Sequence, residues 1–271
     1  MLTFERQSYL LEFIQKRRSV SVQQLSEHFG VSPMTIRRDL RALEKKNQVT
    51  RIHGGVTISN GVPGIPEEKR AVMNIAQKSA IGEVAVRLVQ DGQTIFVDAG
   101  TTTLELVNRL KDFRGLTVVT NSVKVLYTLA ASPGINLIGV GGAVYGGAWS
   151  FIGPLAESGI RRFHSDLAFL GITSLSLNHG LTEINYFEGD VKNQIIKQSQ
   201  RIVVLADSSK FEKVSPHSVV PLSEVDTIIT DDQLPEELAL AYRKAGIELM
   251  IAKTNIHQPA YSPYAAEPNL P

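Results

Sequence analysis

Hydrophobic residues in the first 46 positions recur every three or four residues, which is the spacing of one buried face of an α-helix. This pattern predicts helices over residues 4–16, 21–29 and 33–46. The third helix has the clearest start, because Ser32 suits the capping position and Pro33 suits the first helical position. Its predicted buried stripe consists of Ile36, Leu40 and Leu43. Gly30 ends the second helix, so a tight turn joins the second and third helices.

The buried stripe turns the other side chains of the third helix toward the opposite face. That face carries Met34, Thr35, Arg37, Arg38 and Arg41. A tight turn followed by a helix with an exposed basic first half is typical of a helix-turn-helix, whose second helix enters the DNA major groove. Arginine fits this role because its planar guanidinium pairs with phosphate oxygens or with the O6/N7 edge of guanine. The alternative is that these arginines pair with Asp39 and Glu44 on the protein surface.

Residues 49–58 alternate as a strand, a Gly-Gly turn and a second strand, which predicts a small wing beside the helix-turn-helix. Arg51 and His53 of this wing would approach the DNA backbone, although simple packing or capping is an equally good interpretation of His53. The predicted DNA-binding residues are Ser32, Met34, Thr35, Arg37, Arg38, Arg41, Arg51 and His53.

Beyond a Pro/Gly-rich stretch, the pattern changes to alternating strands and helices. A long helical stretch is expected over residues 67–89, followed by strands at 94–97, 116–120, 135–140, 167–170, 202–205, 226–230 and 248–251, with helices between them. Such alternation favours an α/β domain with a largely parallel sheet. We therefore expect a DNA-binding domain over residues 1–58, a linker over 59–66, an α/β domain over 67–251 and a disordered tail over 252–271.

Small polar loops follow several of the predicted strands. They contain Asp98, Gly100, Thr101, Thr102 and Thr103; Asn121; Gly141 and Gly142; and Asp207 and Lys210. Loops of this kind at the carboxyl ends of parallel strands bind ligands, and a helix start with threonine hydroxyls suits a phosphate group. The alternatives are that the Gly/Thr loop merely caps a helix and that Asp207 and Lys210 pair in a turn. Glu188 and Lys192, at i and i+4, form either a helix-stabilising pair or part of the binding site.

Charge divides the chain into two parts. Residues 1–58 hold ten Lys and Arg against five Asp and Glu, a net charge of +5, whereas the rest of the chain carries −4. A basic first part on a mildly acidic body is consistent with binding to a polyanion. The chain has no cysteine and its six histidines are scattered, so we expect no metal site and no cofactor. The sequence shows neither a secretory signal nor an apolar run of membrane-spanning length, and we expect a cytoplasmic protein with no membrane contact.

The motifs together resemble those of the DeoR family of bacterial transcriptional regulators. The resemblance rests on residues 32–40, 43–44 and 51–55 in the first part, and on residues 98–103, 120–122, 141–142 and 207–211 in the second. Asn47 departs from the family, which commonly has Gly there. The resemblance implies a winged helix-turn-helix joined to a Rossmann-like sensor domain that is similar to ribose-5-phosphate isomerase.

By this resemblance, the chain is a non-enzymatic repressor of a sugar or polyol catabolic operon, released from double-stranded operator DNA by a phosphorylated sugar. A homodimer or homotetramer is expected, located in the cytoplasm and on the nucleoid when bound to DNA. The implied effector-binding residues are Asp98, Gly100, Thr101, Thr102, Thr103, Asn121, Gly141, Gly142, Glu188, Lys192 and Lys210. The alternative is a sugar-phosphate isomerase with an accessory DNA-binding domain, in which Glu188, Asp207 and Lys210 are candidate catalytic groups.

Overall fold

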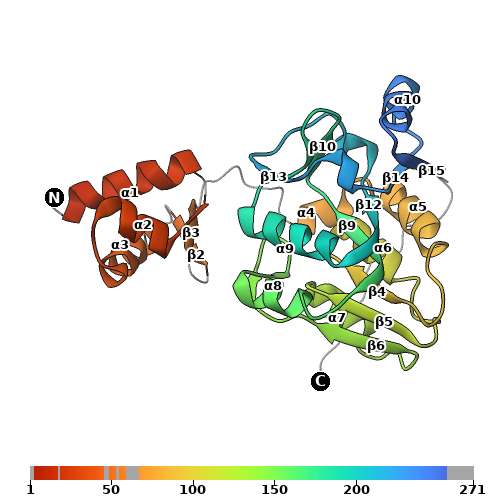
Figure 1. Ribbon diagram of the computed structural model, residues 1–271, viewed down its shortest axis with the longest axis horizontal. Helices are drawn as coiled ribbons and strands as arrows, with labels where there is room; N and C mark the ends of the chain where they lie inside the picture. Colours follow the sequence, from red (N-terminus) through yellow and green to blue (C-terminus); the bar gives the residue numbers. More distant parts are fainter. Residues whose placement is uncertain (1–2, 18, 46–48, 53–54, 59–66, 255–271) are drawn as a thin grey trace.

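The computed structural model describes residues 3–17, 19–45, 49–52, 55–58 and 67–254. It has a small N-terminal part made of helices and short strands, and a larger part built around a sheet (Figure 1). The predicted linker over residues 59–66 lies outside the described residues, so the exact domain boundaries stay a prediction.

The N-terminal part contains helices α1 (Thr3–Arg17), α2 (Val22–Phe29) and α3 (Pro33–Lys45) and strands β2 (Val49–Ile52) and β3 (Gly55–Ile58). The predicted helix signals are confirmed. Ser21 and Gln24 form a reciprocal capping box at the start of α2, and Gly30 ends it in the left-handed conformation with φ of 63°. The predicted stripe of α3 is buried in one hydrophobic cluster with Leu10, Ile14 and Leu25.

The wing has one more strand than the sequence predicts. Strand β1 (Ser19–Ser21) pairs antiparallel with β3, which gives a sheet of order β1-β3-β2. A three-residue strand has too few positions to show an alternating pattern, so only the tertiary pairing reveals it.

The long helix predicted over residues 67–89 is wrong, because the structure has two helices there. Helix α4 (Glu67–Val72) ends before Met73, and α5 (Ile75–Val86) begins after Asn74, which adopts φ of +51°. The Asn74 side-chain amide donates to Asp207 Oδ1 at 3.1 Å, and this bond joins the left-handed turn to a segment that is 133 residues away in the sequence. Asparagine tolerates the left-handed conformation better than most residues, and it breaks the helix here.

Parallel strands form the main sheet of the larger part. Its order in the described part of the chain is β15-β14-β12-β9-β4-β5-β6. The strands are β4 (Thr94–Val97), β5 (Leu116–Thr120), β6 (Ile135–Gly139), β9 (Ser165–Gly171), β12 (Ser199–Leu205), β14 (Thr227–Asp231) and β15 (Glu248–Ala252). The chain runs from β4 to β6 on one side and returns to β9 on the other, so the strand order switches between β4 and β9.

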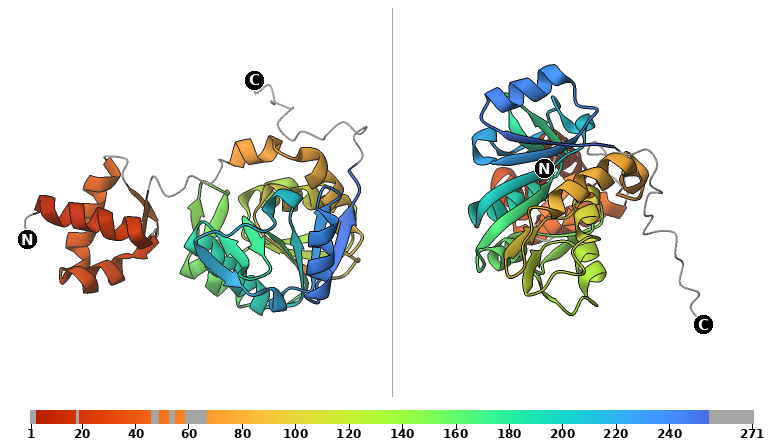
Figure 2. Two further views of the ribbon diagram at one scale, coloured as in Figure 1. Left: turned by 90° about the horizontal axis from the view of Figure 1, so that it is seen from above. Right: turned by 90° about the vertical axis from the view of Figure 1, so that its right-hand side faces the viewer.

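Helices cover both faces of this sheet (Figures 1 and 2). Alternate residues of one strand reach opposite faces, as in β4, where Ile95 and Val97 belong to one hydrophobic cluster and Phe96 to the other. The first cluster contains residues of α5, α6 (Thr101–Val107) and α7 (Val123–Leu129). The second contains residues of α8 (Pro154–Ile160), α9 (Tyr186–Lys197) and α10 (Glu236–Lys244).

Several short elements escaped prediction. They are the hairpin β7 (Ala143–Tyr145) and β8 (Ser150–Ile152), helix α8, the small sheet of β10 (Ser174–Ser176), β11 (Gly180–Glu183) and β13 (His217–Val220), and the 3₁₀ turns η1 (Ser208–Lys210) and η2 (Leu222–Glu224). Each is too short for a hydrophobic period to stand out. The partner of β11 on its other side, β13, is also distant in sequence.

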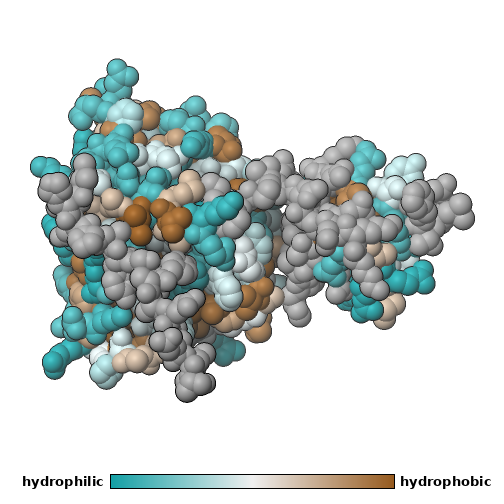
Figure 3. Space-filling model, turned by 180° about the vertical axis from the view of Figure 1, so that it is seen from behind, coloured by the Kyte–Doolittle hydropathy of each residue, from teal (hydrophilic) through white to brown (hydrophobic). Residues whose placement is uncertain are grey.

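Strand β15 ends one residue beyond 251, where the sequence analysis ends the α/β domain. Ala252 is the last residue of β15, and Thr254 beyond it donates to both carboxylate oxygens of Asp232. Among the described residues, no helix has the length and apolar character needed to cross a membrane. On the face seen in Figure 3, hydrophilic residues cover most of the coloured surface, and hydrophobic ones form small separate groups.

Candidate DNA-binding face and strand-end site

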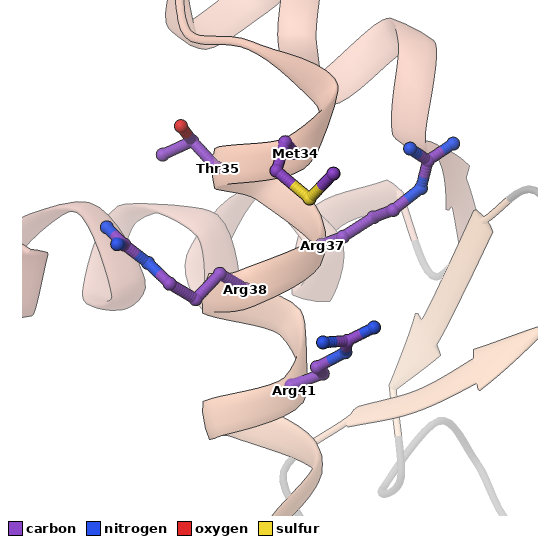
Figure 4. A pocket seen from close by; sticks show the side chains of 5 residues that line it. All are labelled: Met34, Thr35, Arg37, Arg38 and Arg41. Carbon is purple, nitrogen blue, oxygen red and sulfur yellow. The ribbon is translucent and has the colours of Figure 1, made fainter.

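Helix α3 presents the basic face that its sequence predicts. Arg37, Arg38 and Arg41 are exposed, and Met34 is 69% exposed. With Thr35, these side chains line a shallow hollow on α3, where Arg37 and Arg41 extend to one side of the helix and Arg38 to the other (Figure 4). Within the described residues, none of the three arginines has an ion-pair partner.

The start of α3 is fixed by Ser32, whose Oγ accepts from the Thr35 backbone N–H at 3.3 Å. The two side-chain oxygens of Ser32 and Thr35 are 3.0 Å apart. Ser32 is exposed, so it is placed both to cap the helix and to lie against a ligand. Arg51 belongs to β2, but its side chain and the whole of His53 lie outside the described residues.

Asp39 does not pair with the exposed arginines, so that part of the alternative is wrong. It is fully buried, and its Oδ2 accepts from Arg6 Nε at 2.6 Å. This pair ties α1 to α3 and leaves the guanidinium groups of Arg37, Arg38 and Arg41 available for an external anion.

A second group of polar residues lies where the order of the main sheet switches. The Asp98 backbone N–H, just after β4, donates to the Phe169 carbonyl of β9 at 3.0 Å. Gly100 lies next to Gly171, since a Cβ added to Gly100 would be in ordinary van der Waals contact with the Gly171 Cα, at 3.8 Å. Carboxyl ends of parallel strands at a switch point are the usual ligand-binding place in open α/β sheets.

Three carboxylates surround Lys192 at this place. Lys192 is 3% exposed, its Nζ forms a short ion pair with Asp98, and Glu183 Oε1 lies 3.6 Å away. Burial would lower the pKa of Lys192, but the carboxylates of Asp98, Glu183 and Glu188 outweigh it and raise this pKa. We call Asp98, Glu183, Glu188 and Lys192 the strand-end site.

Glu188 does not form the i, i+4 ion pair with Lys192 that the sequence offers as one alternative. The ion pairs of Lys192 in the described structure are with Asp98 and Glu183 rather than with Glu188. Ser150 Oγ donates to the carboxyl oxygen Oε1 of Glu188 at 3.5 Å. Burial and the neighbouring Glu183 raise the pKa of Glu188 to about 8. Near neutral pH this carboxyl is therefore largely protonated, and it can donate a hydrogen bond.

Two predicted ligand residues are already used inside the protein. Thr103 Oγ1 donates to the carbonyls of Asp98 and Gly100, and Asn121 Oδ1 accepts from the Ala99 backbone N–H. These bonds shape the loop from Asp98 to Thr103. Thr101 and Thr102 lie in the first turn of α6, 9% and 8% exposed, with Gly100 at the capping position.

The remaining predicted residues lie at neighbouring strand ends. Gly141 and Gly142 follow β6 with φ of 70° and 127°, and Gly142 packs against Ile152 and Ala156. Among the described contacts, none joins them to the strand-end site. Lys210 lies in η1 after β12, half-buried, and burial is the main cause that lowers its pKa. The Lys210 backbone N–H donates to the Asp207 carbonyl at 3.0 Å, so the two residues share a turn as the alternative expects. The Asp207 carboxylate accepts from Asn74 and Ser209, and the described contacts include no ion pair between it and the Lys210 side chain.

Sequence reasoning missed Glu183, Arg70 and Lys78. Glu183 is the last residue of β11, a strand that the pattern does not show. Arg70 Nη2 donates to the Gly147 carbonyl at 3.0 Å, and the buried Lys78 ammonium donates to the carbonyls of Arg70 and Met73. Burial lowers the pKa of Lys78 to about 8, against the raising effect of Asp207. For Arg70 and Lys78, the sequence shows only a helical stretch, and a helical pattern does not reveal which other segments the helix contacts.

Comparisons with known proteins agree with both parts of the chain. The DeoR-like helix-turn-helix domain matches residues 6–61, and the DeoR C terminal sensor domain matches residues 73–232. A putative aga operon transcriptional repressor of Escherichia coli O157:H7 is 32% identical over 92% of this chain and 94% of its own. The HTH-type transcriptional regulator GolR of Listeria innocua is 32% identical over 93% and 100%.

A solved D-ribose-5-phosphate isomerase in complex with phospho-erythronic acid aligns with a TM-score of 0.38 and 15% identity. That match spans 49% of this chain and 52% of the isomerase, and it identifies neither a ligand nor an activity. Among the described residues, no group of three or more His, Asp or Glu side chains could hold a metal ion. The relatives of full length are regulators with a helix-turn-helix rather than enzymes. The chain is therefore a member of the DeoR family of transcriptional regulators and not an enzyme.

Proposed function

We propose that this chain represses a sugar or polyol catabolic operon and leaves its operator when a phosphorylated sugar binds the larger part. The observation that carries the DNA-binding half is the exposed face of α3, with three arginines that lack ion-pair partners in the described structure. Relatives support the class of regulated gene, since one is named as a repressor of the aga operon. Such a protein acts in the bacterial cytoplasm, on operator DNA.

The DNA contacts are assigned to α3 and the wing. Arg37, Arg38 and Arg41 supply phosphate and base contacts, while Met34, Thr35 and Ser32 lie against the groove at the start of α3. Arg51 and His53 would extend the contact from the wing. A symmetric homodimer or homotetramer would place paired α3 helices in successive major grooves, which requires a repeated or palindromic operator.

The effector would bind at the carboxyl ends of the strands. Glu188 and Lys192 bind sugar hydroxyls, Lys210 faces an acidic group, and the loop from Asp98 to Thr103 shapes the floor. Asn121, Gly141 and Gly142 border this region. For release, the effector must bind the DNA-incompetent arrangement more tightly, and a coupling of about 1–3 kcal/mol changes operator affinity roughly 5–150-fold.

The first test concerns DNA. An operator is enriched from random duplex DNA with the full chain, and its affinity is measured by fluorescence anisotropy. We expect Arg37→Ala and Arg38→Ala each to weaken binding at least tenfold. The matched control is Arg87→Ala, because Arg87 is exposed on the larger part and, among the described residues, forms its ion pair with Glu83. Unchanged operator affinity in both α3 variants would refute the assignment.

The second test concerns the effector. A panel of pentose, hexose and polyol phosphates is added to the protein–operator complex, with the unphosphorylated sugars as controls. We expect one phosphate ester to release the DNA and to raise the melting temperature of the free protein, because a ligand of the native state stabilises it. If free sugars act as well as their esters, the phosphate requirement is wrong.

A further inference from the structure

Helix α4 carries a cation that no sequence motif singled out. Arg70 is half-buried, and its only side-chain hydrogen bond in the described structure is to the Gly147 carbonyl, at 3.0 Å. No carboxylate of the described residues lies within ion-pair distance of it. A guanidinium bonded to a single neutral oxygen keeps most of its five N–H donors for another acceptor.

The turn between α4 and α5 places Arg70 beside the loop that holds Lys210. Asn74 in this turn donates to Asp207 and lies 3.4 Å from Ser209 Oγ, directly before Lys210. The buried Lys78 ammonium binds the Arg70 carbonyl and fixes the end of α4. The other neighbour of Arg70 is the turn between β7 and β8, and Ser150 of β8 contacts Glu188. Arg70 therefore lies between the Lys210 loop and the strand-end site.

Lys210 is a second half-buried cation, and its side chain has no hydrogen-bond or ion-pair partner among the described residues. The charge of Arg70 acts on this neighbourhood, because it helps to lower the pKa of Lys210 and partly offsets the rise in the pKa of Glu188. Two positive groups that repel each other across a partly buried space favour an anion between them. A phosphate monoester suits this place, because its oxygens accept from an arginine fork and a lysine together.

We propose that Arg70 and Lys210 form the subsite for the phosphate group of the effector, and that Arg70 exchanges the Gly147 carbonyl for that phosphate. This inference rests on the proposed function, which it deepens by placing the anion. The proposed phosphate subsite differs from the loop of Thr101–Thr103, which the sequence analysis considers for the phosphate. In that loop the Thr103 hydroxyl already donates to backbone carbonyls of the protein. Since α4 is the first described element after the DNA-binding part, the phosphate would be held by the segment leading to that part.

The single tryptophan gives a local reporter of this exchange. Trp149 is two residues beyond Gly147, is 42% exposed, and accepts at its carbonyl from the Val123 N–H at 2.9 Å. The full chain is titrated with inorganic phosphate, and with chloride at matched ionic strength, while Trp149 fluorescence is recorded. We expect a saturable change with phosphate alone.

The variants are Arg70→Met, Arg70→Lys and Lys210→Met, with Arg87→Met as the exposed control, and the melting temperature of each establishes that it is folded. Loss of a charge-assisted contact predicts phosphate affinity weakened roughly tenfold or more in both methionine variants. The lysine variant keeps the charge but loses the fork, so its affinity falls in between. Even if Arg70→Met fails to fold, Arg70→Lys and Lys210→Met still decide the outcome.

Phosphate affinity equal to wild type in the folded variants would overturn the subsite and leave the proposed function intact. A wild-type chain that gives no phosphate response also overturns it. Release of operator by a phosphate ester is measured separately, so the failure of the subsite and the failure of effector control are distinguishable.

Discussion

At the scale of single residues, Asp39 belongs to the helix that carries the DNA-binding face, but its side chain is buried and holds two helices together. Its buried pair with Arg6 joins α1 to α3, and removing one partner of a buried pair leaves an uncompensated charge. We expect Arg6→Ala to lower the free energy of unfolding of the N-terminal part by about 3 kcal/mol. Urea unfolding followed by circular dichroism measures this loss, while Trp149 fluorescence reports that the larger part is unchanged. A loss no larger than that of Arg87→Ala would contradict the argument.

Glu188 gives a pH dependence whose sign is fixed by its environment. Its pKa rises from 4.5 to about 8 on folding, because of burial and then Glu183. The folded state therefore binds the proton more tightly, and this contribution to stability is present below pH 4.5 and lost as pH rises through about 8. We expect the melting temperature of Glu188→Gln to fall less than that of the wild type between pH 5 and pH 8.5. At the alkaline end, the melting temperature of this variant is expected to be the higher of the two. The exposed Glu237→Gln is the control, and parallel curves for Glu188→Gln and wild type would refute this account.

At the scale of elements, the turn between α4 and α5 depends on Asn74. Its φ of +51° suits asparagine or glycine but costs a β-branched residue about 1–2 kcal/mol. Asn74→Gly loses only the bonds to Asp207 and Ser209, whereas Asn74→Val also strains the backbone. We expect the valine variant to melt several degrees below the glycine variant in a thermal scan. Equal melting temperatures would show that this turn relaxes without cost.

At the scale of the whole molecule, the charge division predicts how operator affinity responds to salt. Residues 1–58 carry +5, so contacts with DNA phosphates release counterions and the affinity falls steeply with salt. We expect each α3 arginine that contacts a phosphate to reduce the slope of log affinity against log salt by about 1 when changed to Ala. An arginine that reads a base changes sequence preference instead. Anisotropy titrations over a salt series separate these roles, and variants with neither effect would place the DNA elsewhere.

The sequence could predict those elements of the fold that carry a local signal. The helices of the N-terminal part, their caps and the parallel strands were found, because each buries a regular stripe or carries a local start or stop signal. The wing strand β1, the hairpin β7–β8 and the strands β10, β11 and β13 were missed because they are short. Strands β1 and β13 are also paired with segments that are distant in sequence. The break at Asn74 was missed because the apolar residues on either side keep a helical spacing.

What the sequence by itself determined is therefore local: the helix-turn-helix with its basic face, the alternation of strands and helices, and the motifs shared with the DeoR family. Those features depend on neighbouring residues, whose spacing the chain records directly. The tertiary structure alone decided which charged groups meet. It buried Asp39 against Arg6, surrounded Lys192 with Asp98 and Glu183, and set Arg70 beside the Lys210 loop. Most of these partners are far apart in the sequence, and only the packing of helices and strands against one another brings them together.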